Sequence, residues 1–123
     1  MKLNHINLPV QDVPAATLFF ETHFGFKSEN SIVNDTISIL RGDDDFVLVL
    51  MHNKLNQNGN STYPDAFHIG FLQETNENVN SVYKRLKDAG IEVGDEPQRI
   101  RKTFGFYFKH QDILIEISTD VKD

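Results

Sequence analysis

Three side chains that can hold a metal ion stand at related places in this 123-residue chain. His5 is in the alternating stretch LNHINLP, His68 is in the stretch AFHIGFL, and Glu116 is in the stretch ILIEIS. Two imidazoles and one carboxylate are the ligands of a facial metal triad, which leaves coordination positions open for a substrate. The three residues therefore predict a site for a divalent metal (Fe, Mn, Zn or Ni), provided that the fold brings them together.

Each of the three also has a plainer explanation. A histidine in a strand is usually a hydrogen-bonded, partly buried residue, and a carboxylate can simply face a wet cavity. We favour the metal site for two reasons. His5 and His68 occupy equivalent positions of a repeat, and a carboxylate with apolar neighbours needs a cation, a histidinium or water, because an unpaired buried charge is unstable.

The two histidine stretches begin two copies of one structural pattern. In each copy, a strand that contains the histidine is followed by a polar turn and a helix, and a glycine ends the helix. The first helix is predicted from the N-cap Asp12 to about Phe24, before Gly25. The second begins at the cap Thr75 and ends at Gly90. The chain is thus expected to contain the same unit twice.

Three strands are expected after each helix. In the first copy they cover residues 26–33, 36–40 and 46–51, with a hairpin around residues 34 and 35. In the second copy they cover residues 91–93, 98–108 and 113–118. We therefore predict an α+β fold of two βαβββ modules with mixed sheets in one domain, residues 1–123: module one at about 1–53, a polar linker at 54–64 and module two at 65–123.

Strand alternation assigns further residues to the face that carries Glu116. Tyr107 points to this face, so Tyr107 and Glu116 are the predicted catalytic residues, and Tyr107 is also a predicted hydrogen-bond donor to substrate. An amphipathic tyrosine at a cavity mouth explains Tyr107 equally well. Asn7, two residues after His5, is a second predicted substrate contact. Aligning the copies puts Val49 opposite Glu116, so module one offers no carboxylate there.

Composition excludes several kinds of partner. The formal net charge is −6, so neither a nucleic acid nor an anionic membrane surface is expected as a partner. The chain has no cysteine, which removes disulfides and thiolate chemistry. No apolar run approaches the roughly 20 residues of a membrane span. We expect a cytoplasmic protein whose ligand is a small molecule.

These motifs together resemble the vicinal oxygen chelate superfamily, which includes glyoxalase I, extradiol dioxygenases, fosfomycin-resistance thiol transferases and bleomycin-binding proteins. The resemblance rests on the early histidine in LNHINLPVQDV, the second in FHIGF and the glutamate in FYFKHQDILIEIS. It implies curled mixed sheets, a divalent metal, and a homodimer in which His5 of one chain meets His68 and Glu116 of the other. The sequence leaves open whether the modules pair within a chain or between chains.

Two departures from the family pattern bear on the activity. Glyoxalase I carries a second glutamate where this chain has Val49, which argues against true glyoxalase I activity. The turn before the last strand, KHQDI, is shorter than the family's Asp-Pro-Asp-Gly turn, so His110 is expected in an altered hairpin loop.

We therefore expect a metal-dependent enzyme that acts on a small oxygenated substrate and is of the lyase/isomerase, dioxygenase or thiol transferase type. The main alternative is a metal-free protein that binds a drug or another small molecule in a dimer groove, as bleomycin-binding proteins do. The acidic balance suits a cationic ligand of that kind. A structural dimer with a degenerate site is a third possibility. Metal content separates the first from the other two.

Overall fold

The computed structural model describes residues 1–29, 35–58 and 63–121. It divides the chain into two compact units, residues 1–62 and 63–123. The boundary lies inside the segment predicted as a linker, residues 54–64. Within the described ranges, no helix is long and apolar enough to cross a membrane.

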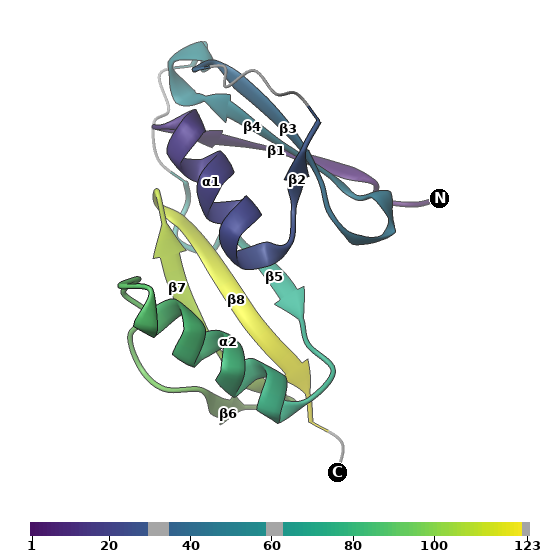
Figure 1. Cartoon of the computed structure of the whole chain (residues 1–123), viewed down its shortest axis with the longest axis vertical. Coiled ribbons are helices and arrows are strands. Elements are labelled where there is room, and N and C mark those ends of the chain that lie inside the picture. The colour runs from purple at the N-terminus through teal and green to yellow at the C-terminus, as the bar shows by residue number, and fades with distance from the viewer. Residues whose placement is uncertain (30–34, 59–62, 122–123) are drawn as a thin grey trace. The chain divides into compact units, whose positions relative to one another are not determined.

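The first unit is one helix on one face of a four-stranded mixed sheet (Figure 1). Strands β1 and β4 are parallel neighbours, β3 is antiparallel to β4, and the sheet order is β1-β4-β3-β2. Short 3-10 turns precede and follow β4. The regular elements are β1 (His5–Val10), α1 (Val13–Phe24), β2 (Lys27–Ser28), β3 (Ile37–Arg41) and β4 (Val47–His52).

The second unit repeats this topology. Its sheet order is β5-β8-β7-β6, with β5 parallel to β8 and the other neighbours antiparallel, and α2 lies against β7 and β8. The predicted fold class, an α+β fold with two βαβββ modules, is confirmed. The elements are β5 (His68–Leu72), α2 (Asn76–Asp88), β6 (Gln98–Ile100), β7 (Thr103–His110) and β8 (Ile113–Asp120).

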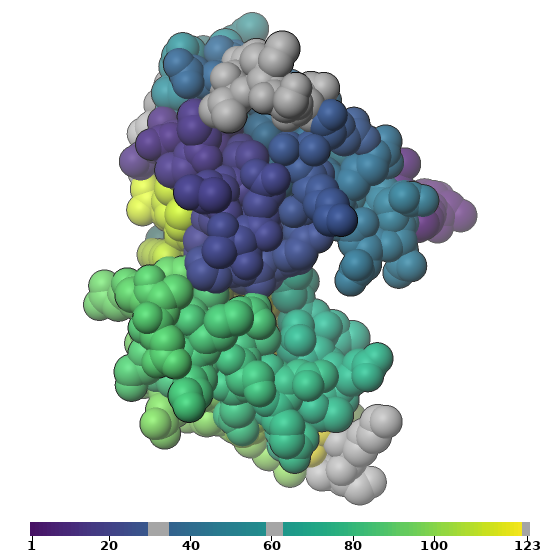
Figure 2. Space-filling model, in the orientation of Figure 1, coloured from purple at the N-terminus to yellow at the C-terminus, as the bar shows by residue number. Residues whose placement is uncertain are grey.

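Both helices begin at the predicted caps. The Asp12 carboxylate accepts a hydrogen bond from the Ala15 amide at 3.0 Å, and the Thr75 hydroxyl accepts one from the Asn78 amide at 3.1 Å. Gly25, with φ of 70°, ends α1 in the left-handed conformation. The outward side of α2 is polar and forms part of the surface drawn in green in Figure 2.

Alternate strand residues build the two cores. In the second unit, Ile113, Ile115 and Ile117 are fully buried on the face of β8 that packs against α2. Burial of each such side chain contributes about 1.5–3 kcal/mol. In the first unit the fully buried side chains include Leu8, Leu40, Leu48, Leu50 and Phe20. The opposite face of each sheet is therefore free to carry polar groups.

The prediction of a strand at residues 91–93 is wrong. The segment is irregular, and the first strand after α2 is β6. Gly90 and Gly94 bracket it with positive φ values of 84° and 63°. The Tyr83 hydroxyl donates a 2.9 Å hydrogen bond to the Gly94 carbonyl, and Val93 is buried. The apolar residues of the segment are thus used for packing rather than for strand pairing.

Two other predicted strands have different boundaries in the structure. The predicted strand over residues 98–108 is a hairpin, because β6 ends before Arg101, which has φ of 57°, and β7 follows. The predicted strand at 26–33 is represented by the short β2, and the hairpin expected around residues 34 and 35 falls partly outside the described residues.

His110 lies in a strand and not in the loop where it was expected. It is the last residue of β7 and pairs with Ile113. Only Gln111 and Asp112 form the turn, with φ values of 48° and 66°. Positive φ at both central residues is the signature of a tight type I′ hairpin, which explains why the turn is short.

Candidate functional site

The face of the second sheet opposite α2 carries a polar cluster centred on Glu116. In the strand register, Glu116 of β8 lies between Gly70 of β5 and Tyr107 of β7. His68 lies one step earlier along the same face, opposite Leu114. Strand alternation predicts that His68, Tyr107 and Glu116 share this face, and the structure brings the three together.

Two hydroxyl groups and one imidazole surround the Glu116 carboxylate. The Tyr107 hydroxyl donates to Oε1 at 2.6 Å, and the Ser118 hydroxyl donates to Oε2 at 2.6 Å. His68 Nε2 lies 3.5 Å from Oε1. Each carboxylate oxygen therefore has its own hydroxyl donor, and only Oε1 also faces the imidazole.

These contacts keep Glu116 ionised. Partial burial by itself raises the pKa of the Glu116 carboxyl, but the hydrogen bonds from Ser118 and Tyr107 and the charge of His68 together lower it below its usual value. The hydrogen bond between Tyr107 and Glu116 also raises the pKa of the Tyr107 phenol. Desolvation and the negative charge of Glu116 raise it further. Tyr107 is therefore a neutral donor and Glu116 a fixed anion at neutral pH.

His68 is oriented by its own backbone. Its Nδ1 lies 3.1 Å from the Ala66 carbonyl oxygen, which can only accept, so this hydrogen bond requires the proton on Nδ1. Nε2 is then the nitrogen that faces Glu116. His5 has a related arrangement, because its Nδ1 lies 2.7 Å from the Asn4 side-chain oxygen. Metal-binding histidines commonly have one ring nitrogen tied to an oxygen in this way.

His68 Nε2 and Glu116 Oε1 fit a shared cation. Ligands held at about 2.0–2.2 Å from one ion lie about 3.0–3.5 Å from each other, which includes the observed separation. The side chain of His68 is 44% exposed and that of Glu116 is 19% exposed, so His68 is the more open of the two to solvent. Among the described residues, no three His, Cys, Asp or Glu side chains form a metal-binding group.

The remaining predicted site residues, His5 and Asn7, belong to the first unit. Both lie on β1 and are exposed, on the face opposite α1. The Asn7 amide nitrogen lies 3.9 Å from the Met51 sulfur. These residues thus lie on the face of the first sheet that corresponds to the Glu116 face of the second.

The register confirms the predicted equivalence of Val49 and Glu116. In the first sheet, Val49 lies between Asn7 of β1 and Ile39 of β3. The two positions that carry Glu116 and Tyr107 in the second sheet are therefore apolar in the first. The charged cluster is confined to one copy of the repeat.

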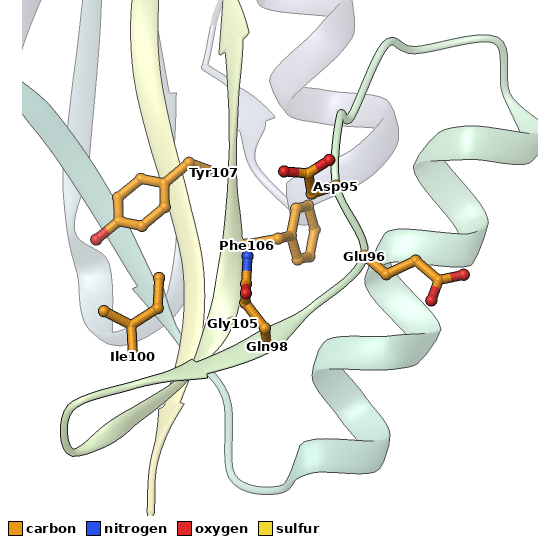
Figure 3. A pocket seen from close by; sticks show the side chains of 7 residues that line it. All are labelled: Asp95, Glu96, Gln98, Ile100, Gly105, Phe106 and Tyr107. Atoms are coloured by element: carbon orange, nitrogen blue, oxygen red, sulfur yellow. The ribbon is translucent and has the colours of Figure 1, made fainter.

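A small pocket of about 150 Å³ adjoins the cluster at the β6 edge. Figure 3 shows that Tyr107 and Phe106 point to opposite sides of β7, and Tyr107 belongs both to this pocket and to the Glu116 face. The pocket is lined by Asp95, Glu96, Gln98, Ile100, Gly105, Phe106 and Tyr107.

Sequence reasoning missed Ser118 as a member of the cluster. Its position two residues after Glu116 predicts that both residues share a face, which was the available signal. The hydrogen bond itself depends on the space opposite Ser118, where β7 has Gly105. Neither the hydroxyl nor the glycine is distinctive in the sequence.

Comparison with known proteins supports the fold. A possible glyoxalase from Bacillus cereus is 35% identical, with 95% of this chain and 97% of that chain covered and a TM-score of 0.78. A hypothetical protein from S. aureus is 26% identical, with coverages of 97% and 93% and a TM-score of 0.76. No curated protein sequence matches the chain.

A more distant structure has the same fold. The fosfomycin resistance protein FosX from Listeria monocytogenes is 20% identical, with 98% and 94% of the two chains covered and a TM-score of 0.77. The model of the Glyoxalase/Bleomycin resistance protein/Dioxygenase superfamily matches residues 2–120, which include both histidines and the whole Glu116 cluster. With two equivalent βαβββ units and this match over nearly its full length, the chain belongs to that superfamily.

Proposed function

We propose that this protein is a metal-dependent enzyme in which His5, His68 and Glu116 hold one divalent metal ion, with Zn, Ni, Mn and Fe as the candidates. Its substrate is a small molecule that presents two neighbouring oxygens. The reaction is of the lyase/isomerase, dioxygenase or thiol transferase type.

The observation that carries this proposal is the orientation of His68 beside Glu116. With its proton on Nδ1, a neutral His68 turns the Nε2 lone pair toward an ionised carboxylate oxygen 3.5 Å away. Two lone pairs facing each other repel, so the pair needs a positive charge between them. Either a proton on Nε2 or a metal ion supplies that charge, and a divalent ion supplies more of it.

The other residues of the site have separate roles in this proposal. A bound metal ion acts as a Lewis acid for the anion that develops on the substrate. Tyr107 holds the carboxylate and presents a phenol at the edge of the site, and Asn7 offers an amide to a bound ligand. Val49 leaves the first sheet without a second carboxylate, so we do not propose true glyoxalase I activity.

Elemental analysis of protein purified without chelator tests the metal site. We expect about one divalent ion per chain in the wild type, and loss of the ion in His5→Ala, His68→Ala and Glu116→Gln. His52→Ala is the matched control, because His52 Nδ1 accepts from the Lys54 amide and lies outside the cluster. No metal in the wild type, before or after titration with these four ions, refutes the proposal.

We propose a homodimer as the assembly, and a mixing experiment tests whether His5 comes from the partner copy. When they are not mixed, the His5→Ala protein and the Glu116→Gln protein should each lack the metal. If sites form between chains, refolding the two together restores metal to about half of the sites in mixed dimers, because one of the two sites then has all three ligands. No recovery on mixing places the triad within one chain.

A metal-free binding protein is the second candidate function. It is favoured by the fixed negative charge of Glu116 on an exposed sheet face, together with the net charge of −6. A cationic ligand then takes the position of the metal ion. Thermal shift with basic glycopeptides identifies this function, if the stabilisation is lost in Glu116→Gln and kept in the presence of a metal chelator.

A further inference from the structure

Ser118 is a buried polar residue on a face that is otherwise open. Only 6% of its surface is exposed, and its hydroxyl donates to Glu116 Oε2 at 2.6 Å. A hydroxyl bonded to a carboxylate at this distance makes a strong, charge-assisted hydrogen bond. Ser118 therefore holds one specified oxygen of Glu116.

The register places Ser118 and His68 on opposite sides of Glu116 along β8. His68 pairs with Leu114, two residues before Glu116, whereas Ser118 is two residues after it. Oε1 is the oxygen near His68, and Oε2 is the oxygen bonded to Ser118. The two carboxylate oxygens thus have different surroundings. By binding Oε2, the Ser118 hydroxyl helps to keep Oε1 as the oxygen that faces His68.

Gly105 of β7 leaves the space that Ser118 occupies. The two residues pair directly, and a Cβ added at Gly105 would lie 2.7 Å from the Ser118 Cβ. It would also lie 2.2 Å from the Ile117 carbonyl oxygen. The strands approach so closely that any side chain at position 105 would displace Ser118, so the glycine and the serine work as a pair.

We propose that Ser118 is a positioning residue that occupies Oε2 and thereby makes Glu116 bind its cation through Oε1 alone. This inference rests on the proposed metal site and specifies how Glu116 uses it. Without the Ser118 hydroxyl, Oε2 has no hydroxyl donor, and the carboxylate, which Tyr107 still holds through Oε1, can offer Oε2 to the cation as well. Ser118 therefore controls the number of oxygens at the metal, and through it the number of positions left for substrate.

Cobalt(II) is the probe, because its visible absorption reports coordination number and geometry. The wild type, Ser118→Ala and Ser118→Thr are titrated with cobalt(II), with Thr119→Val as the control. Thr119 is also buried but lies on the opposite face of β8. We expect Ser118→Ala to weaken cobalt(II) binding about ten-fold and to change the visible spectrum. We expect Ser118→Thr, which keeps a hydroxyl, to have the affinity and the spectrum of the wild type.

Each other outcome has a defined meaning. An unchanged spectrum in Ser118→Ala overturns the inference, whether or not the affinity falls, because it shows that coordination is independent of Ser118. An equal change in Thr119→Val overturns it as well, since the effect is then one of core stability. If the wild type binds no cobalt(II) at all, the proposed metal site fails and this inference fails with it. Circular dichroism of each variant establishes that it is folded.

Discussion

Two glycines on the Glu116 face should respond in opposite directions to the same added methyl group. Gly70 and Gly105 flank β8 on its two sides, on β5 and β7. At Gly70 the nearest atom to an added Cβ is the Glu116 Cβ at 4.0 Å, an ordinary contact. At Gly105 the added Cβ meets the backbone oxygen of Ile117 at 2.2 Å. We predict that Gly70→Ala stabilises the protein and Gly105→Ala destabilises it.

The size of the difference follows from the contacts. Gly→Ala at a compatible position gains about 0.4–1 kcal/mol, because the unfolded chain loses conformational freedom. Overpacking costs about 1–3 kcal/mol, and the contact at Gly105 belongs at the upper end, because a backbone atom cannot rotate away. The net loss for Gly105→Ala is then about 2 kcal/mol, and the two variants should differ by about 3 kcal/mol.

Urea denaturation followed by far-ultraviolet circular dichroism measures the difference. We expect the midpoints to move in opposite directions with unchanged slopes, since neither variant alters the surface exposed on unfolding. In a thermal scan, Gly105→Ala should lower Tm by about 6–10 °C. If the two alanine variants agree within about 0.5 kcal/mol, the close approach of β7 and β8 at Gly105 is not a feature of the protein, and the argument for Ser118 loses its steric basis.

Three further predictions concern the caps and the titrating pair. Asp12→Ala and Thr75→Ala should each lower the free energy of unfolding by about 1 kcal/mol in urea, because each loses a helix cap; no loss would contradict the cap assignment. The pKa of Glu116 is lowered in the folded state, so its contribution to stability is present above the ordinary carboxyl pKa and is lost as the pH falls through the folded value. Tyr107→Phe should raise the pKa of Glu116, measured by carbon-13 NMR, and make the loss of stability in acid less steep; an unchanged pKa would refute the hydrogen bond. The pKa of Tyr107 is raised, so its contribution to stability is present below the ordinary tyrosine pKa of 10.0 and is lost as the pH rises through the folded value. Tyr107→Phe should remove this alkaline step from an ultraviolet titration and leave that of Tyr63, whose pKa burial raises to about 12.

Local patterns were sufficient to predict the helices and the faces of the strands. Asp12 and Thr75 cap their helices because a short polar side chain satisfies a free amide wherever a helix begins. Glu116 and Tyr107 share a face because side chains alternate along a strand with a period of two. Both rules act over a few residues and need no knowledge of the rest of the fold.

The errors arose where distant packing decides the structure. Residues 91–93 have the composition of a strand, but the Tyr83 hydroxyl holds Gly94 and the segment packs without a strand partner. The turn after His110 lacks the glycine that usually permits positive φ, so its tight form was not predicted. Ser118 joined the site only because Gly105, on another strand, leaves room for it.

Because the protein has two equivalent sheets, one sheet serves as a reference for the effect of charge on the local opening of strands in the other. The row Asn7–Val49–Ile39 and the row Gly70–Glu116–Tyr107 share one register, one topology and one solvent. Amide hydrogen exchange in a single sample therefore compares an uncharged row with a charged one. Changing the pH alters the ionisation of the Glu116 row, whereas the Val49 row has no titrating side chain. The difference in exchange between the two rows therefore measures what the carboxylate and its two hydroxyl donors contribute to holding the strands together.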